Sequence, residues 1–334
     1  MKILVTGGAG YIGGTFAYEA LKNNHKVLAL DNFSNSKPEQ IDNLKNIFEK
    51  NFEFFEIDLS IQSEQLSNCI KEFKPDVIVH FAGLKAVGES QKHPIKYWNN
   101  NVVSSINLIE AMAHNEVKKL IFSSSATVYG DSDQQPIPET AEIKSMSVYG
   151  STKIAVERMF SEAARVGVID VVSLRYFNPV GAHKEKIIYE NPFDLPNNLM
   201  PRIIRVALGI DEELQILGDD YETRDGSGER DYIHILDLIA GHFSAIEFIL
   251  KNNGESIFNL GTGVSTSVYE LIKTFESTNS IKIPYRICNR RPGDVAKCYA
   301  DPKLALNELN WQAEYDLSEM CKDAWLGVKD NESG

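Results

Sequence analysis

Short apolar runs alternate with longer amphipathic stretches along the first half of the chain. The runs carry Val, Ile, Leu and Phe at successive positions, as strands that are buried on both faces do. The stretches between them have the apolar periodicity of helices with one buried face. The expected strands are KILVT, KVLAL, FEFFEI, DVIVHFA, KLIFSSS and IDVVSLRYF, and the expected helices cover 11–23, 38–50, 62–73, 94–115 and 149–166. This order predicts an α/β fold with a Rossmann-like doubly wound parallel sheet.

The regular alternation of strands and helices becomes less clear after about residue 177, where Pro, Asn and Gly interrupt segments such as NPVGAH and GDDYETRDGSGERD. We therefore expect a first domain over 1–176 and a smaller, mixed α/β second domain over 177–334. The amphipathic segment 237–251 and the strand-like IFNLG can return to the first domain, so part of 233–262 is expected to join it. A chain of 334 residues is long enough for two hydrophobic cores.

The formal net charge of −13 disfavours a nucleic acid or a membrane surface as partner, because both are polyanions. An anionic small ligand must then meet a local basic site. The four cysteines have no Cys-x-x-Cys spacing and are too few for a disulfide scaffold, which indicates reduced thiols. No segment approaches a membrane-spanning apolar length, and MKILVTGG has too short an apolar run for a signal peptide. These features predict a cytoplasmic protein without a membrane anchor.

The stretch TGGAGYIG directly follows the first expected strand and opens a helix. Its glycines Gly7, Gly10 and Gly13 would let the backbone approach a pyrophosphate, which the helix N-terminus attracts through its N–H groups and positive dipole end. Asp31 ends the second expected strand, 18 residues after Gly13. A carboxylate there binds a ribose 2′-hydroxyl and repels a 2′-phosphate, so the pattern predicts an NAD site rather than an NADP site. The alternative is a tight strand-to-helix turn without a ligand.

Tyr149 and Lys153 lie four positions apart in SVYGSTK, at the start of an expected helix, and so share one helix face. A nearby ammonium favours the phenolate, so we expect Lys153 to lower the pKa of Tyr149 and make it a usable base. Ser125, in SSSATVYG, ends the fifth expected strand, on the side where open α/β sheets bind ligands. It can hold a substrate hydroxyl against the phenol. Taken singly, the pair can be ordinary helix surface and the serine can bond a loop amide.

The chain also carries FAGLKAVGES, RYFNPVGAH, NNLMP, RDYIHILDL and RRPGD. With the motifs above, it resembles the UDP-glucose 4-epimerases, a family of extended short-chain dehydrogenases/reductases, over nearly its whole length. The resemblance implies an NAD-dependent isomerase with the catalytic residues Ser125, Tyr149 and Lys153. It implies cofactor contacts from Gly7, Gly10, Tyr11, Ile12, Gly13, Asp31, Asn32, Asp58, Leu59, Phe81, Lys85, Asn100, Tyr149, Lys153 and Phe177. It places a UDP-sugar against Lys85, Ser125, Tyr149, Asn178, Asn198, Leu199, Arg230, Arg291, Asp294 and Cys298.

The resemblance further implies inversion of carbon 4 of UDP-hexoses through a 4-keto sugar, in galactose metabolism, by a homodimer built from helices 94–115 and 149–166. The nearest alternative is a nucleotide-sugar 4,6-dehydratase. The related dehydratases carry Asp-Glu after the strand-five hydroxyl residue, where this chain has Ala126 and Thr127, which cannot shuttle protons in that way. An alternative from another class is a non-catalytic NAD-binding scaffold, which the intact serine, tyrosine and lysine disfavour.

Arg230 and Arg291 come from distant loop segments and can clamp a diphosphate, which would let a strongly acidic protein bind an anion. Their alternative is surface salt bridging to neighbouring acidic residues. Asn178 and Asn198 can donate amide hydrogen bonds to sugar or phosphate oxygens, although asparagine beside proline or asparagine also forms loops.

Metal chemistry is not expected, because none of the histidines has a paired ligand spacing with Cys, Asp or Glu. These histidines are His25, His80, His93, His114, His183, His234 and His242. The chain also has no phosphate-loop lysine motif and no Gly-x-Ser-x-Gly turn. Nucleotide hydrolysis and acyl transfer therefore lack their required parts.

Cys298 stands four residues after Asp294 of RRPGD. In the family this position lies beside the hexose. It is a bulky tyrosine in members restricted to UDP-glucose and UDP-galactose, and a smaller residue in members that also accept N-acetylated sugars. If the segment is a strand, Tyr299 faces the opposite side. The resemblance therefore predicts activity on UDP-N-acetylglucosamine and UDP-N-acetylgalactosamine too, the alternative being that another side chain closes the space around a small buried cysteine.

Overall fold

The computed structural model describes residues 1–185, 187–190, 196–291 and 293–332. Its chain divides into two compact units. Unit 1 consists of Met1–Val128, Ser147–Arg175 and Ile239–Phe258, and unit 2 of Tyr129–Met146, Tyr176–Leu238 and Asn259–Gly334. The segment 129–146 thus groups with unit 2, whereas the sequence placed it in the first domain.

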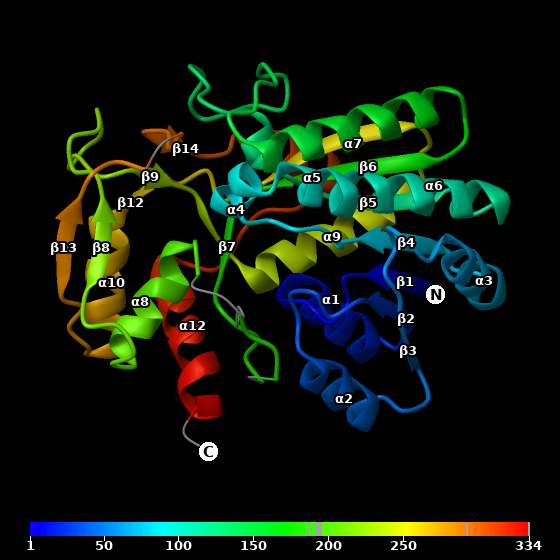
Figure 1. Cartoon of the computed structure of the whole chain (residues 1–334), viewed down its shortest axis with the longest axis horizontal. Helices are drawn as coiled ribbons and strands as arrows, with labels where there is room; N and C mark the ends of the chain where they lie inside the picture. Colours follow the sequence, from blue (N-terminus) through cyan, green and yellow to red (C-terminus); the bar gives the residue numbers. More distant parts are fainter. Residues whose placement is uncertain (186, 191–195, 292, 333–334) are drawn as a thin grey trace. The chain divides into compact units, whose positions relative to one another are not determined.

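Unit 1 is built on a seven-stranded sheet with the strand order β11-β6-β5-β4-β1-β2-β3. β1 pairs in parallel with β2 and β4, β2 with β3, and β4 with β5. The strands are β1 Lys2–Thr6, β2 Lys26–Asp31, β3 Phe52–Glu56, β4 Val77–His80, β5 Lys119–Ser125, β6 Asp170–Tyr176 and β11 Glu255–Leu260. Figure 1 shows helices on both sides of this sheet. The predicted Rossmann-like doubly wound class is confirmed.

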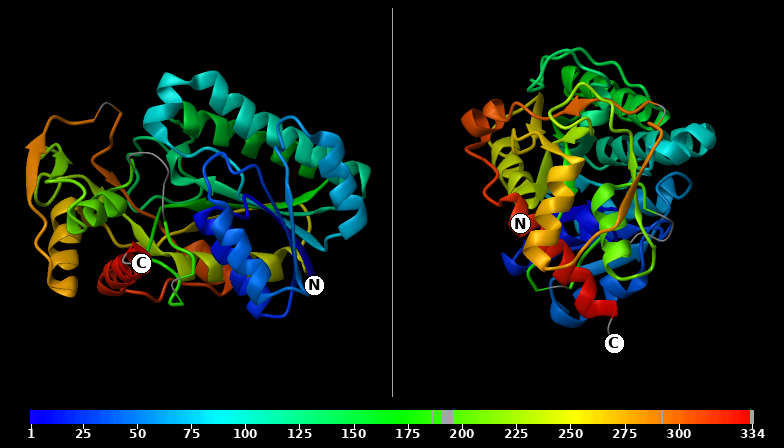
Figure 2. Two further views of the ribbon diagram at one scale, coloured as in Figure 1. Left: turned by 60° about the horizontal axis from the view of Figure 1, so that its bottom comes forward. Right: turned by 90° about the vertical axis from the view of Figure 1, so that its left-hand side faces the viewer.

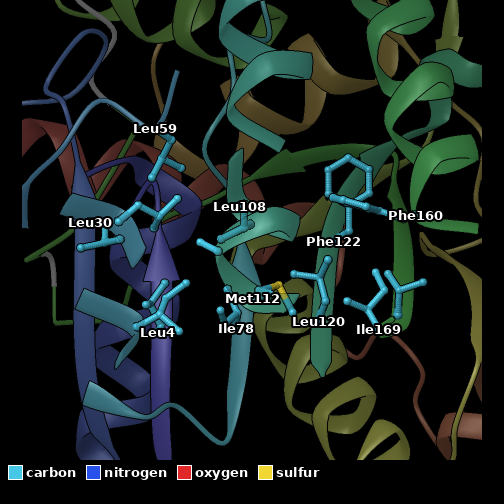
Figure 3. Close-up of a cluster of buried hydrophobic side chains, with 14 of the residues drawn as sticks. Leu4, Leu30, Leu59, Ile78, Leu108, Met112, Leu120, Phe122, Phe160 and Ile169 are labelled. Carbon is cyan, nitrogen blue, oxygen red and sulfur yellow. The ribbon is translucent and has the colours of Figure 1, made fainter. Parts of the chain in front are cut away.

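Figure 2 shows the helices of unit 1 from two further sides. They are α1 Tyr11–Lys22, α2 Pro38–Ile47, α3 Ser63–Phe73, α4 Val87–Lys92, α5 Pro94–Tyr97, α6 Ser104–His114, α7 Val148–Arg165 and α9 Ile235–Ile249. On one face, side chains of α3, α6 and α7 pack on strand residues in a single cluster (Figure 3). On the other face, Phe16 of α1 stacks on Phe243 of α9 with 5.0 Å between ring centroids.

Phe122 of β5 and Phe160 of α7 belong to the cluster in Figure 3. Their rings meet edge to face with centroids 5.1 Å apart, and both side chains are buried. Burial of a phenylalanine side chain contributes about 1.5–3 kcal/mol, and an aromatic pair about 0.5–1.5 kcal/mol beyond that. This contact therefore anchors α7 on β5, the two elements that carry the predicted catalytic residues.

The continuous helix expected over 94–115 is interrupted in the structure. After α5 the backbone forms a π-helical segment, η1 Trp98–Val103, before α6 begins. The serines at the start of α6 turn their hydroxyls back to main-chain carbonyls: Ser104 bonds Asn100 and Ser105 bonds Asn101 at 2.7 Å. A π-turn inserts an extra residue into a helix and often marks a functional site. The apolar periodicity of the segment did not reveal it.

Unit 2 contains small sheets and four helices in its described part. β7 Asn178–Val180 pairs with β10 Tyr232–His234, β8 Leu214–Leu217 with β13 Tyr285–Cys288, and β9 Glu229–Arg230 with both β12 Thr266–Ser267 and β14 Lys297–Cys298. The helices are α8 Leu199–Ala207, α10 Val268–Asn279, α11 Lys303–Leu309 and α12 Leu317–Glu332. Side chains of α8, α10 and α12 form a second core, in which Phe275 meets Trp325 edge to face. The second domain is thus mixed α/β, with its own hydrophobic core.

Candidate active site

The glycine turn between β1 and α1 is too tightly packed for side chains. Gly7 has a φ of +71°, and a Cβ there would lie 2.8 Å from the main-chain nitrogen of Ala82. A Cβ on Gly13 would lie 2.2 Å from the carbonyl oxygen of Gly7. Gly10 occupies the N-cap of α1 and has no side chain to cover the first turn. The turn therefore has the form that lets a diphosphate approach the N-terminus of α1, where Tyr11 and Ile12 begin the helix.

Asp31 lies beside the same turn, at the end of β2. Its Oδ2 accepts a hydrogen bond from the main-chain nitrogen of Ala9 at 3.0 Å. Its Oδ1 accepts bonds from the main-chain nitrogen of Phe33 at 2.9 Å and from Ser36 Oγ at 2.8 Å. The carboxylate thus ties the glycine turn to the segment after β2.

Asn32 and Asp58 form a second polar pair at this edge of the sheet. Asn32 Nδ2 donates to Asp58 Oδ2 at 3.0 Å, and Ser60 donates to Asp58 Oδ1 through both its main-chain nitrogen and its hydroxyl. Burial opposes ionisation of Asp58, but these hydrogen bonds outweigh it and lower its pKa. Leu59 is buried next to the pair.

The segment after β4 is held by asparagines of η1. The main-chain nitrogen of Leu84 donates to Asn100 Oδ1 at 3.1 Å and to Asn101 Oδ1 at 2.8 Å. Asn101 Nδ2 also donates to the Leu84 carbonyl and to Thr152 Oγ1 of α7, each at 3.0 Å. This segment carries Phe81, which is half-buried, and Lys85, which is exposed.

The three predicted catalytic residues lie together on β5 and α7. The Ser125 hydroxyl lies close enough to the phenol of Tyr149 to favour its ionised form. Lys153 Nζ lies 6.0 Å from the centroid of the Tyr149 ring, and it donates to the carbonyl oxygen of Ser123 at 2.6 Å. Tyr149 and Lys153 are both buried. A phenol, a hydroxyl and an ammonium are thus assembled on one face, a set suited to moving the proton of a substrate hydroxyl.

The expected lowering of the Tyr149 pKa is wrong for the protein's own groups. Burial raises the pKa of Tyr149 to about 12, although the Ser125 hydroxyl acts in the opposite direction. Burial also lowers the pKa of Lys153 to about 8, against the attraction of Glu157. The lysine ammonium donates to the Ser123 carbonyl rather than to the phenol. The free-energy cost of burying a phenolate therefore exceeds the stabilisation that the surrounding side chains give it.

The first turn of α7 is held by two serines. Ser147 is the N-cap, and its Oγ accepts a hydrogen bond from the main-chain nitrogen of Gly150 at 3.0 Å. Ser90 of α4 is fully buried, and its Oγ accepts from the main-chain nitrogen of Tyr149 at 3.2 Å. The same hydroxyl donates to the Val87 carbonyl at 2.6 Å. The backbone of Tyr149 is therefore positioned by a segment that lies far from it in the sequence.

In unit 2, Arg230 and Arg291 meet at one carboxylate. Arg230 Nη2 forms an ion pair with Asp294 Oδ1, and Arg291 Nη2 lies 3.4 Å from the same oxygen. The exposed fraction of the side chain is 19% for Arg230 and 40% for Arg291. The two guanidinium groups are thus brought together, and the acidic partner that the sequence left as an alternative is also present.

Cys298 lies beside this cluster, because it pairs with Arg230 across β14 and β9. Burial raises the pKa of its thiol to about 11, so the side chain is neutral near pH 7. Asn178 is half-buried on β7, and its main-chain nitrogen donates to the Asp231 carbonyl at 2.9 Å. Phe177 is buried next to it.

Asn198 and Leu199 lie at the start of α8 in unit 2. The exposed Asn198 donates from Nδ2 to Glu190 Oε1 at 3.3 Å, and Leu199 is half-buried. The proline of RRPGD lies outside the described residues.

Two further findings concern only the described residues. Among them, no group of three or more His, Cys, Asp and Glu side chains could hold a metal ion. Within the same ranges, every helix is too short or too polar to cross a membrane.

Comparison with known proteins places the chain in a family. Residues 4–324 match the family model described as GDP-mannose 4,6 dehydratase. UDP-glucose 4-epimerase of Bacillus subtilis is 45% identical over 335 residues, which cover 100% of this chain and 98% of that protein. The chain belongs to the UDP-glucose 4-epimerase family. This confirms the resemblance drawn from the motifs, within the extended short-chain dehydrogenases/reductases.

Solved structures of UDP-glucose 4-epimerases have the same fold as this chain. The enzyme of Stenotrophomonas maltophila, crystallised with NAD and formylated UDP-arabinopyranose, has a TM-score of 0.96 and 42% identity, with all of both chains covered. The UDP-Glc/GlcNAc 4-epimerase of Campylobacter jejuni has a TM-score of 0.85 and 34% identity, over 98% of this chain and 99% of that one.

Three residues that help to hold the candidate site were not found from the sequence motifs. Ser90 is the last residue of the FAGLKAVGES motif, and Asn101 follows Asn100. Both bond main-chain groups of other segments. Glu157 lies four residues after Lys153, on the same face of α7. The spacing of four residues from Tyr149 to Lys153, continued by four more, would have pointed to Glu157.

Proposed function

We propose that the protein interconverts UDP-glucose and UDP-galactose by inverting carbon 4 of the hexose, with NAD as a tightly held cofactor. The observation that carries the proposal is the Ser125, Tyr149 and Lys153 group on β5 and α7. It is supported by membership of a family in which a 42% identical enzyme has been crystallised with NAD and a UDP-sugar.

The residues of unit 1 fit a dinucleotide. The side-chain-free glycine turn and the N-terminus of α1 would receive its pyrophosphate, and Asp31 would accept a hydrogen bond from a ribose hydroxyl. The carboxylate disfavours the 2′-phosphate of NADP. The remaining contacts expected from the resemblance stay predictions, including those of Asn32, Asp58 and Lys85.

A bound NAD would supply a hydride acceptor and donor for carbon 4, so that the hexose would pass through a 4-keto form and turn its other ring face to the nicotinamide before reduction. Tyr149 would take the proton of the 4-hydroxyl and give it back, while Ser125 bridges the phenol and the sugar oxygen. Because burial holds the pKa of Tyr149 at about 12, a phenolate near neutral pH requires added positive charge. An oxidised nicotinamide would supply it.

The diphosphate of the substrate would be bound in unit 2 by Arg230 and Arg291. Their present partner, Asp294, is an anion that a diphosphate would compete with or bind beside. The homodimer and the cytoplasmic location stay predictions.

The dehydratase alternative lacks a proton shuttle in the sequence after Ser125. Ala126 is buried, and Thr127 donates to Ser125 Oγ from its main-chain nitrogen at 3.2 Å and from its hydroxyl at 3.0 Å. Neither position carries a carboxylate for eliminating water. A GDP-mannose dehydratase reaction, as the description of the family model would suggest, is therefore not favoured.

The proposal is tested by assaying the purified protein on UDP-galactose without added NAD. Tyr149→Phe should lower turnover by at least ~100-fold, the scale of losing a general acid/base, and leave the fold and bound NAD in place. Tyr285→Phe, at an exposed tyrosine, serves as the control and should turn over like wild type. Near-wild-type turnover of a folded Tyr149→Phe protein would exclude Tyr149 as the base, and an inactive wild type would reject the function.

We further propose that the enzyme also accepts UDP-N-acetylglucosamine and UDP-N-acetylgalactosamine. The support is the small, half-buried Cys298 next to Arg230, and a 34% identical relative named for both UDP-Glc and GlcNAc. Cys298→Tyr should remove activity on the N-acetylated pair by steric exclusion and spare the other pair. Cys298→Ser keeps the side chain small and should retain both. Kinetics on both substrate pairs decide, and a wild type inert toward the N-acetylated sugars contradicts the idea.

A further inference from the structure

Three residues of α7 spaced four positions apart face the carboxyl end of β5, one for each of its last three residues. The pairs are Tyr149 with Ser125, Lys153 with Ser123, and Glu157 with Ser124. Residues at this spacing share one face of a helix. The first two pairs belong to the proposed chemistry, and the third lies one helical turn behind them.

Glu157 is held by more than the serine. Arg175 of β6 donates to it twice, from Nε to Oε1 at 3.1 Å and from Nη2 to Oε2 at 2.8 Å. Ser124 Oγ donates to Oε1 as well. The exposed fraction of the side chain is 3% for Arg175 and 8% for Glu157. This bidentate pair joins α7, β5 and β6 through one buried carboxylate.

Such a pair is not explained by stability alone. Taking two charges out of water costs about as much as their attraction returns, and apolar residues of similar volume often serve equally well. What an apolar residue could not supply is a negative charge one turn from Lys153. Burial lowers the pKa of Lys153, and Glu157 is the group that raises it.

We infer that Glu157 is a positioning residue of the proposed epimerase reaction, which fixes the register of α7 on β5 and keeps Lys153 charged. The inference rests on the proposed function for its catalytic consequence only. Arg175 and Ser124 hold the carboxylate in place, one turn of helix from Lys153, whose Nζ donates to the Ser123 carbonyl.

The other titratable groups near Lys153 do not supply this charge. His80 of β4 is buried and neutral, with its pKa lowered to about 3 by burial and by the lysine itself. Arg175 of β6 is a cation, and Tyr149 is a phenol with a raised pKa. The segments before η1 carry the charged residues Lys85, Glu89 and Lys96, which lie toward the Tyr149 end of α7 or toward water rather than beside Lys153. The η1 segment contributes the uncharged Asn100 and Asn101.

The test compares wild type, Glu157→Gln, the double variant Glu157→Gln/Arg175→Met, and Glu162→Gln. Gln keeps the shape of the side chain and removes its charge. The double variant also removes the arginine that would be left buried without a counter-charge, and so separates loss of charge from loss of folding. Glu162 is an exposed residue of the same helix, paired with Arg165 at 2.6 Å, and serves as the matched control.

Two measurements are made on each protein: the pH dependence of turnover of UDP-galactose, and the titration of Lys153 by NMR of 13C-labelled lysine, with the signal assigned through Lys153→Arg. In Glu157→Gln, we expect the lysine titration and the alkaline limb of turnover to move to lower pH by about one pH unit, the scale on which one nearby opposite charge acts. The double variant should titrate closer to wild type, because it loses the cation of Arg175 together with the carboxylate. Glu162→Gln should follow the wild type in both.

The inference is overturned if Lys153 titrates in a folded Glu157→Gln protein as in wild type, because the Glu157–Arg175 pair would then have a structural role only. The NMR titration does not depend on turnover. If the wild type fails to epimerise UDP-galactose, the proposed function is rejected, while the titration still decides whether Glu157 sets the charge of Lys153.

Discussion

His80 is a neutral histidine at the end of β4, and its replacement should change how the stability of unit 1 depends on pH. The side chain is fully buried. Its Nδ1 lies 2.7 Å from Thr6 Oγ1 and its Nε2 lies 3.0 Å from Ser105 Oγ, so both ring nitrogens have hydroxyl partners. His80→Gln keeps a polar group of similar reach and removes the titration.

The magnitude follows from the pKa of the histidine. Burial, together with the positive charge of Lys153, lowers the pKa of His80 from 6.5 to about 3. Below pH 6.5 the unfolded chain therefore takes up a proton that the folded chain refuses, and the free energy of unfolding falls as the pH falls. The slope approaches about 1.4 kcal/mol per pH unit for one group, which amounts to about 2 kcal/mol between pH 6.5 and 4.5 and to nearly 3 kcal/mol between pH 7.5 and 4.5.

The assay is urea unfolding at half-unit steps of pH between 7.5 and 4.5. Trp98 lies in unit 1, whereas Trp311 and Trp325 lie in unit 2. In a background with Trp311→Phe and Trp325→Phe, the fluorescence of Trp98 reports on unit 1. The difference in unfolding free energy between parent and His80→Gln should shift in favour of the variant on acidification, by nearly 3 kcal/mol over the window.

Any loss of packing in His80→Gln is independent of pH, so it displaces the whole curve without altering its slope. His114→Gln, at an exposed histidine at the end of α6, controls for removing an imidazole and should keep the parent slope. Parallel curves for parent and His80→Gln would refute the reasoning, since they would mean that His80 takes up its proton equally in the folded and unfolded states.

Two further predictions concern the positioning of cofactor and base. Asp31→Ala removes the acceptor of the Ala9 amide and of the proposed ribose hydroxyl, so the affinity for NAD should fall by at least about tenfold, as loss of a hydrogen bond to a charged group implies, and less NAD should be released per protein on denaturation. Full NAD occupancy after purification would count against that role. Ser90→Ala leaves the main-chain nitrogen of Tyr149 without its acceptor, so the free energy of unfolding should fall by about 1–3 kcal/mol and turnover should fall with it, whereas Ser90→Thr should restore most of both. Unchanged stability and turnover in Ser90→Ala would contradict this.

The sequence by itself determined the features that depend on local spacing and sterics. Strands with apolar residues on both faces can only be buried in a sheet covered on both sides, which is why β1, β4 and β5 were predictable. Gly7 and Gly13 were recognisable because a turn this close to its neighbours excludes a Cβ. Tyr149 and Lys153 were recognisable because a separation of four is one turn of helix.

Only the tertiary structure decided what depends on distant partners and on burial. The Ser90 bond to the Tyr149 amide and the Glu157–Arg175 pair join segments that lie far apart in the sequence. The π-turn at η1 is not visible in the apolar periodicity of its segment. Burial also reversed the expected direction for the pKa of Tyr149, because the cost of removing a phenolate from water is set by the atoms that surround it. Spacing along the chain is a local property, whereas desolvation and long-range pairing exist only once the chain has packed.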